Sequence, residues 1–168
     1  MNLNINKNEP VMVTGATGFV ASWLVKKLMD NGITVHAAVR NTDDSIKLAH
    51  LKNLENGSSG KIIFFKSDLL KDGSYLEAMK GCGIVFHTAS PFNFSVTDNK
   101  KGFIDPAFIG TQNVLKSVNN TESVKRVVLT SSCAAIYGDA ADIAMYPGQV
   151  MTEEMWNTSS TETHNAYS

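Results

Sequence analysis

Two glycines spaced by two residues follow a short apolar run near the start of the chain. The run is Val11–Thr14, the glycines are Gly15 and Gly18, and an apolar helical pattern begins directly afterwards. Strand, tight turn and helix in this order expose the unpaired amides of a helix N-terminus, where the helix dipole favours negative charge. Gly15 lets the turn close, and Gly18 lets the backbone approach a phosphate without an intervening Cβ. The stretch therefore predicts a site for the pyrophosphate of a dinucleotide.

The context of the glycines decides between this site and an ordinary strand–turn–helix corner that binds nothing, because the glycine pattern alone is weak evidence. Ala21 replaces the third glycine of the usual pattern, a difference of one methyl group. An amphipathic helix is expected after Gly18, because apolar residues recur there at helical spacing: Phe19, Val20, Trp23, Leu24 and Leu28. A second apolar run, residues 33–39, ends where the ribose of the cofactor would lie, and this favours the dinucleotide.

A cation follows that second apolar run. Arg40 comes directly after it, and Lys47 lies seven residues further on. Chains that bind NAD usually place an acid here for the ribose hydroxyls, whereas chains that bind NADP place a cation for the 2′-phosphate. A guanidinium makes two parallel charge-assisted hydrogen bonds to phosphate. We predict NADP(H), bound through Arg40 and Lys47; the alternative is that Arg40 is a solvated cation and that Asp43 or Asp44 binds the ribose.

Apolar segments alternate with helical patterns along the rest of the chain. Strands are expected at residues 11–14, 33–39, 61–66, 84–88 and 126–130, with helices between them that end near residues 31, 54, 79 and 119. This alternation predicts a parallel sheet covered on both faces, an α/β doubly wound (Rossmann) fold in one domain, 1–168. The fold usually has six or more strands, so we expect the chain to be incomplete at its C-terminal end.

Two helices carry more detailed predictions. Ser74 is expected to cap the short helix that ends near residue 79. The long helix, residues 103–119, is expected to place four apolar residues on one face: Ile104, Phe108, Leu115 and Val118. From residue 139 to residue 149 the periodicity fails, which indicates an excursion at the surface.

Composition excludes several classes of function. The chain has 168 residues, 43% of them hydrophobic, and a formal net charge of -1. A charge so near zero indicates no nucleic-acid or anionic-membrane partner. No apolar run reaches spanning length and the polar start lacks a signal-peptide core, so we expect a cytoplasmic protein. The sequence does not determine the oligomeric state.

Neither the cysteines nor the histidines suggest a metal site. No cluster of His, Cys or acidic residues has the spacing of metal ligands, so no metal is expected. Cys82 and Cys133 are expected to be reduced thiols. His87 falls within a buried strand pattern and is interpreted as a packed or hydrogen-bonded core histidine, and no role is assigned to His164.

Six short motifs span the chain from residue 11 onward. They are Thr14-Gly-Ala-Thr-Gly-Phe-Val-Ala21, Val39-Arg-Asn41, Ser67-Asp-Leu69, Val85-Phe-His-Thr-Ala-Ser-Pro91, Pro106-Ala-Phe-Ile-Gly-Thr-Gln-Asn-Val114 and Val127-Val-Leu-Thr-Ser-Ser132. In this order they resemble the extended short-chain dehydrogenases/reductases of the NAD-dependent epimerase/dehydratase superfamily. The chain is most similar to the dihydroflavonol 4-reductase and cinnamoyl-CoA reductase branch, which includes bacterial and fungal aldehyde and ketone reductases.

The resemblance implies which residues contact the cofactor. Asp68 and Leu69 would flank the adenine, Ala89 and Pro91 would lie along the cofactor, and Asn113 would be a structural residue of the long helix. With the glycine loop and the cations, the implied NADP(H)-binding set is Thr14, Gly15, Thr17, Gly18, Phe19, Val20, Arg40, Lys47, Asp68, Leu69, Thr88, Ala89, Ser90, Pro91, Thr130 and Ser131.

The resemblance also implies the catalytic groups. Family enzymes use a serine after the fifth strand, a tyrosine, and a lysine four residues beyond the tyrosine. Ser132 and Tyr167 match the first two, and the lysine position lies beyond this chain, as would the small substrate domain of the family. Serine would hold the substrate carbonyl, and tyrosine would protonate the developing alkoxide. A neighbouring ammonium would bring the phenol pKa down from about 10.

The implied activity is NADPH-dependent reduction of a small-molecule aldehyde or ketone by hydride transfer, and we expect the 168-residue chain alone to be inactive. Two other functions stay open at this point. A nucleotide-sugar epimerase or dehydratase would hold NAD tightly on the same fold, although Arg40 argues against it. A non-catalytic dinucleotide-binding module is the second alternative.

Overall fold

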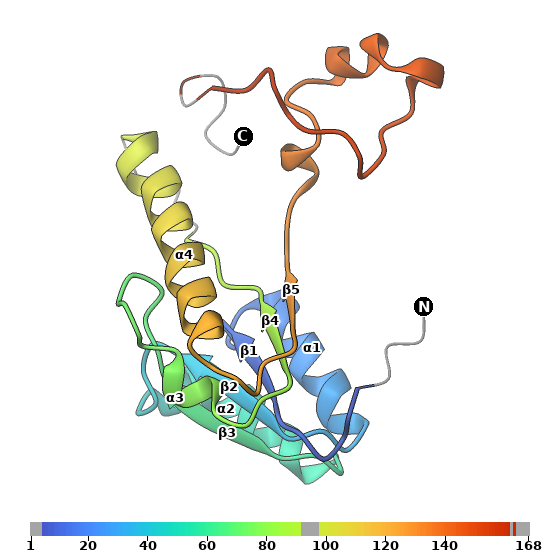
Figure 1. The fold of residues 1–168 in the computed structure, drawn as a ribbon. Coiled ribbons are helices and arrows are strands. Elements are labelled where there is room, and N and C mark those ends of the chain that lie inside the picture. Colours follow the sequence, from blue (N-terminus) through green and yellow to red (C-terminus); the bar gives the residue numbers. More distant parts are fainter. Residues whose placement is uncertain (1–4, 92–97, 162, 164–168) are drawn as a thin grey trace. The chain divides into compact units, whose positions relative to one another are not determined.

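The computed structural model describes residues 5–91, 98–161 and 163 of the chain (Figure 1). In these residues one sheet is built from β1 (Val11–Thr14), β2 (Val35–Val39), β3 (Ile62–Lys66), β4 (Ile84–His87) and β5 (Arg126–Leu129). The strands lie in the order β3-β2-β1-β4-β5, and every neighbouring pair is parallel. This is the predicted doubly wound α/β fold.

The strand register brings four strand ends to one edge of the sheet. Val11 pairs with Val35 on one side and with Ile84 on the other, and Val39 pairs with Lys66. The carboxyl ends of β1, β2, β3 and β4 therefore lie along the same edge. Ligands of open α/β sheets bind outside this edge, at the point where the strand order reverses.

Helices cover both faces of the sheet. α1 (Phe19–Asp30) and α2 (Ser45–Lys52) pack on one face, while α3 (Leu76–Met79) and α4 (Asp105–Asn119) lie on the other (Figure 1). Successive residues of β1 serve the two faces in turn, since Val13 joins the core under α1 and Met12 joins the core under α3 and α4. A single π-helical turn, Lys100–Ile104, precedes α4.

The buried stripes of α1 and α4 are not formed by their largest apolar residues. α1 buries Ala21, Val25, Leu28 and Met29, whereas Phe19, Val20 and Trp23 are 81%, 65% and 60% exposed. α4 buries Gly110, Val114 and Ser117, while the predicted face is mostly exposed at Ile104, Phe108 and Leu115. Small residues such as Ala21 and Gly110 let each helix pack closely against its neighbours. Hydrophobic periodicity does not predict this close packing.

Ser74 does not cap α3, so that prediction is wrong. The residue before α3 is Tyr75, and no side chain caps the helix. Ser74 Oγ instead donates to the carbonyl oxygen of Asp68 over 2.6 Å and accepts the Asp68 amide over 3.1 Å. The hydroxyl therefore closes the loop that follows β3.

The chain divides into two compact units. One comprises Met1–Ser90 and Phe108–Leu129 and contains the sheet; the other comprises Pro91–Ala107 and Thr130–Ser168. The described part of the second unit contains 3₁₀ turns at Cys133–Ala135, Ala140–Met145 and Pro147–Gln149. The last two lie within residues 139–149, where the sequence predicted a surface excursion without helical periodicity. None of the helices in the described ranges combines the length and the apolar character that crossing a bilayer requires.

Candidate dinucleotide-binding site

The loop between β1 and α1 has the backbone geometry of an anion site. Gly15 has a φ of 61°, in the left-handed region, and its carbonyl oxygen accepts the Gly18 amide over 2.8 Å. Gly18 is the N-cap of α1, and no side chain caps this helix. The amides of the first turn therefore have no partner within the helix, and they fit the pyrophosphate that the sequence predicts there.

The segment after β4 lies against this loop. A Cβ added at Gly15 would lie 3.1 Å from both the Cα and the Cβ of Ala89, and a Cβ at Gly18 would lie 3.2 Å from the Gly15 carbonyl oxygen. On the other side, the Ala16 amide donates to the Ala38 carbonyl oxygen of β2 over 3.4 Å. The glycine loop is therefore held between the ends of β2 and β4, and a larger residue at Gly15 would have to displace Ala89.

Thr14 and His87 join the ends of β1 and β4. Thr14 Oγ1 lies 2.9 Å from His87 Nδ1 and accepts the amides of Thr88 and Ala89 over 3.0 and 2.9 Å. Both side chains are buried, and burial lowers the pKa of His87 below its ordinary value. The interpretation of His87 as a hydrogen-bonded core histidine is confirmed.

Arg40 is exposed directly after β2. The neighbouring strand ends beside it, because the Ser67 amide donates to the Val39 carbonyl oxygen over 2.8 Å. Among the described residues, no acidic side chain forms an ion pair with Arg40. Its guanidinium is therefore accessible at the edge where the ribose of a dinucleotide would lie.

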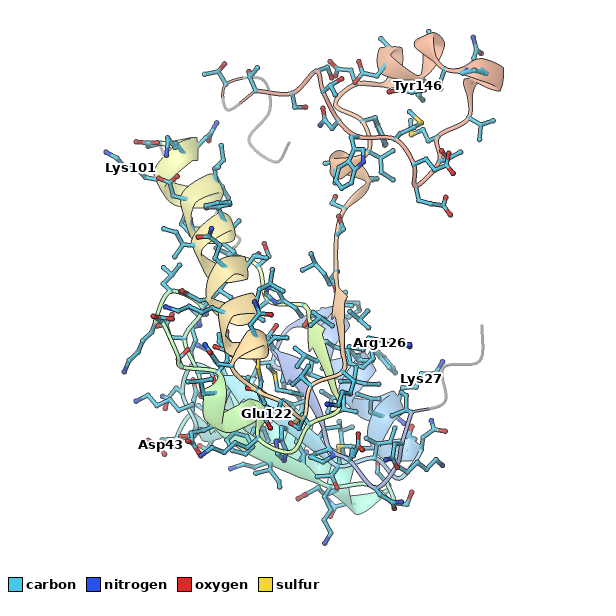
Figure 2. The ribbon with its side chains drawn as sticks, in the orientation of Figure 1. Lys27, Asp43, Lys101, Glu122, Arg126 and Tyr146 are labelled. Carbon is cyan, nitrogen blue, oxygen red and sulfur yellow. The ribbon has the colours of Figure 1, made fainter. Side chains whose placement is uncertain are left out.

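Lys47 and the two acids of the alternative follow Arg40 within seven residues of the chain. Asp44 caps α2, with Oδ1 accepting the Lys47 amide over 3.0 Å and Oδ2 lying 3.6 Å from Lys47 Nζ. Asp43 is exposed in the same loop and is labelled in Figure 2. The Asp44 carboxylate already caps α2, and this contact competes with the ribose hydrogen bonds that the NAD alternative would need.

Asp68 and Leu69 lie in a loop fixed from several sides. Asp68 Oδ1 accepts the Leu70 amide over 2.9 Å, and the Leu69 carbonyl oxygen accepts Asn113 Nδ2 of α4 over 2.9 Å. Burial and, to a lesser degree, the Asp68 carboxylate raise the pKa of Tyr75 to about 12. The loop is therefore ordered beside the end of β3, where the adenine is predicted.

The remaining predicted residues fall in both units. In the first unit, Thr17 is exposed in the glycine loop, and Ser90 follows Ala89. Pro91, Thr130, Ser131 and Ser132 belong to the second unit. Ser132 precedes the turn Cys133–Ala135, and its Oγ accepts the Ala134 amide over 3.2 Å. Tyr167 and His164 lie outside the described residues.

The cysteines are free thiols, as predicted, with Cys82 buried and Cys133 exposed. Burial raises the pKa of Cys82 to about 12, so this thiol is inert. Within the described ranges, no group of three or more His, Cys, Asp or Glu residues is arranged to hold a metal ion.

Sequence reasoning missed three contacts that shape the site. These are the bond between Thr14 and His87, the closure of the Asp68 loop by Ser74, and the packing of Leu69 on Gly110. The residues of the first and third pairs are far apart in the chain. Only the order of the strands and helices in space, which no local pattern gives, brings them together.

Comparisons with known proteins agree with this architecture. Residues 11–168 match the NAD dependent epimerase/dehydratase family. A putative anthocyanidin reductase of Ginkgo biloba is 48% identical over 75% of this chain and 36% of its own length. The cinnamoyl-CoA reductase CAD2 of Medicago truncatula is 44% identical over 91% of this chain and 46% of its own length.

A solved structure shows the same likeness. Gre2 of Candida albicans, crystallised in complex with NADPH, is 34% identical and superposes with a TM-score of 0.74 over 90% of this chain and 45% of the other. The chain thus spans less than half the length of these three relatives. The resemblance inferred from the six motifs is confirmed, and the chain belongs to the NAD dependent epimerase/dehydratase family.

Proposed function

We propose that this chain forms the NADP(H)-binding part of an oxidoreductase that reduces an aldehyde or a ketone. The observation that carries the proposal is the uncapped first turn of α1 behind Gly15, whose left-handed backbone shapes an anion site. Two of the relatives named above are reductases by name, and the third was crystallised with NADPH, which supports the choice of chemistry.

The phosphates and the adenine of the cofactor are held by residues of the first unit. The amides of Phe19 and Val20 receive the pyrophosphate, and Arg40, aided by Lys47, binds the 2′-phosphate. The loop of Asp68 and Leu69 borders the adenine. The accessible guanidinium of Arg40 supports NADP(H) over NAD, because an NAD site has an acid for the ribose hydroxyls at this strand end.

Two side chains act on the substrate. The Ser132 hydroxyl accepts the Ala134 amide, which leaves its hydrogen to bind the carbonyl oxygen of the substrate. Tyr167 donates a proton to the oxygen as negative charge develops there. The nicotinamide of the bound cofactor supplies the hydride. The substrate is a small aldehyde or ketone.

The two arginines of the chain offer a matched test. Arg40 follows β2 at the carboxyl edge, whereas Arg126 begins β5 at the opposite edge and is labelled in Figure 2. Arg40→Ala should weaken NADPH binding by about 1.5–3 kcal/mol and leave NADH binding nearly unchanged, because a charge-assisted hydrogen bond is lost. Arg126→Ala should change neither affinity. Isothermal titration calorimetry measures both.

Two results would contradict the proposal. Equal losses of NADPH and NADH affinity in Arg40→Ala would show that Arg40 does not bind the 2′-phosphate. A folded wild-type protein without affinity for either nucleotide would overturn the whole proposed function, and a marked preference for NADH would favour an epimerase or dehydratase instead.

A further inference from the structure

Thr14, the last residue of β1, has three hydrogen-bonding neighbours around one hydroxyl group. Its Oγ1 lies 3.0 Å from the Thr88 amide nitrogen, 2.9 Å from the Ala89 amide nitrogen and 2.9 Å from His87 Nδ1. Thr14 is 0% exposed and His87 is 1% exposed. Water therefore does not compete for these bonds.

Counting donors and acceptors fixes the protonation of His87. A hydroxyl group has one hydrogen and two acceptor positions, and backbone amides can only donate. The two amides fill both acceptor positions of Thr14, so its hydrogen points to His87 Nδ1. His87 is therefore neutral and carries its own hydrogen on Nε2. Burial also lowers the pKa of His87, which favours this neutral form.

The two amides belong to the segment that contacts the glycine loop. Ala89 presents its Cα and Cβ 3.1 Å from the place of a Cβ on Gly15. Thr88 Oγ1 also donates to the Thr14 carbonyl oxygen over 2.5 Å, so the two threonines hold each other's backbones. A shift of Ala89 would change the space around Gly15, whose carbonyl oxygen holds Gly18 at the start of α1.

We propose that His87 is a positioning residue of the dinucleotide site: by accepting the Thr14 hydrogen, it orients Thr14 to hold Thr88 and Ala89 against the glycine loop. His87 acts through Thr14 and does not touch the cofactor itself. The inference takes its ligand, NADPH, from the proposed function, whereas the hydrogen-bond assignment is independent of it.

An isosteric pair of variants tests this role. In His87→Asn, Oδ1 takes the place of Nδ1 and still accepts from Thr14. In His87→Leu, the side chain has nearly the same shape as asparagine but no acceptor. We expect the Kd for NADPH to stay within about twofold of wild type in His87→Asn and to rise about tenfold in His87→Leu. Calorimetry is performed on the intact protein at a temperature where denaturation curves show every variant folded.

His36 provides the control for general loss of stability. It is buried on β2, and its Nδ1 lies 2.8 Å from the carbonyl oxygen of Ala78 in α3, which packs on the face of the sheet opposite α1. His36→Leu should lower the free energy of unfolding and leave the Kd for NADPH unchanged. A rise in Kd in His87→Leu alone would then separate positioning from stability.

Three outcomes would overturn the inference. His87→Leu could lose stability yet bind NADPH like wild type, or His87→Asn could bind as weakly as His87→Leu. The third is independent of any variant: ¹⁵N NMR of the imidazoles of the wild-type protein should show the Nε2–H form of His87, and an Nδ1–H form would contradict the assignment. A wild-type protein that shows the Nε2–H form but binds no NADPH would sink the proposed function instead.

Discussion

The side-chain amide of Asn113, on α4, donates a hydrogen bond to the main-chain carbonyl oxygen of Leu69 over 2.9 Å. On the same helix, Gly110 leaves so little room that a Cβ there would collide with the Leu69 side chain. Two positions of one helix thus fix a loop that is far away in sequence, 44 residues from Asn113. The loop carries Asp68, which we predict to lie beside the adenine of the cofactor.

Asn113→Leu should lower the free energy of unfolding by about 1–2 kcal/mol, because the partly buried carbonyl group of Leu69 loses its partner. Urea denaturation measures the change. Asn120→Leu is the control: Asn120 makes a similar bond to the Lys116 carbonyl oxygen at the exposed end of the helix, and its loss should cost under about 0.5 kcal/mol. Equal effects in the two variants would mean that the bond to Leu69 contributes no more to the free energy of unfolding than an exposed bond does.

Gly15→Ala should lower the free energy of unfolding by about 1–3 kcal/mol and weaken NADPH binding. Alanine at this position would have to adopt the left-handed backbone conformation of Gly15, and its methyl group would lie 3.1 Å from Ala89. Gly57→Ala is the matched variant, because Gly57 has a φ of -133° and no atom within 4 Å of an added Cβ. Gly57→Ala should leave stability within about 0.5 kcal/mol of wild type, and a Gly15→Ala protein as stable as Gly57→Ala would refute the steric argument.

Acidification should destabilise the fold through His87. Its pKa is lowered in the folded state by burial, so the unfolded chain takes up a proton first as the pH falls. The free energy of unfolding should therefore fall as the pH drops below about 6.5 and level off once the pH is below the folded pKa. Denaturation curves at pH 5 and pH 8 test this, and His87→Asn should lack this part of the pH dependence. The same pH dependence in both proteins would assign it to other groups.

In a protein that includes the lysine position of the family, Tyr167→Phe should reduce kcat for carbonyl reduction by at least about 10²-fold and leave NADPH affinity nearly intact, because only the transferred proton is lost. Tyr146→Phe, in the second unit (Figure 2), is the control and should keep full turnover. Steady-state oxidation of NADPH with a range of aldehydes and ketones measures both. Retained turnover in Tyr167→Phe would remove Tyr167 from the mechanism.

The fold was predictable because its signals are local. Each strand is a short apolar run bounded by turns, and the observed strands begin or end within two residues of the expected ones. The buried faces of α1 and α4 were less predictable. Trp23 is larger than Ala21 and Phe108 is larger than Gly110, yet the smaller residue is buried in each case. Burial here depends on how closely the helix must approach its neighbours, which hydrophobicity does not encode.

The site divides in the same way. The glycine loop and Arg40 are read from adjacent residues, because a strand end and a helix start define them. The bond between Thr14 and His87 joins residues 73 positions apart and depends on β1 and β4 being neighbours. The residue type and position of Ser74 predicted a helix cap, but its hydroxyl group bonds to the backbone of Asp68 instead. Residue types and local patterns identify candidate site residues, and the tertiary structure determines which groups each side chain contacts.

The amides of Thr88 and Ala89 lie outside any strand, yet both donate to an oxygen at the centre of the sheet. Their exchange with deuterated water should therefore require the separation of β1 from β4, and should be as slow as that of the strands themselves. Although this segment is a connecting loop by position, we expect its amides to open to solvent as rarely as those of the central strands.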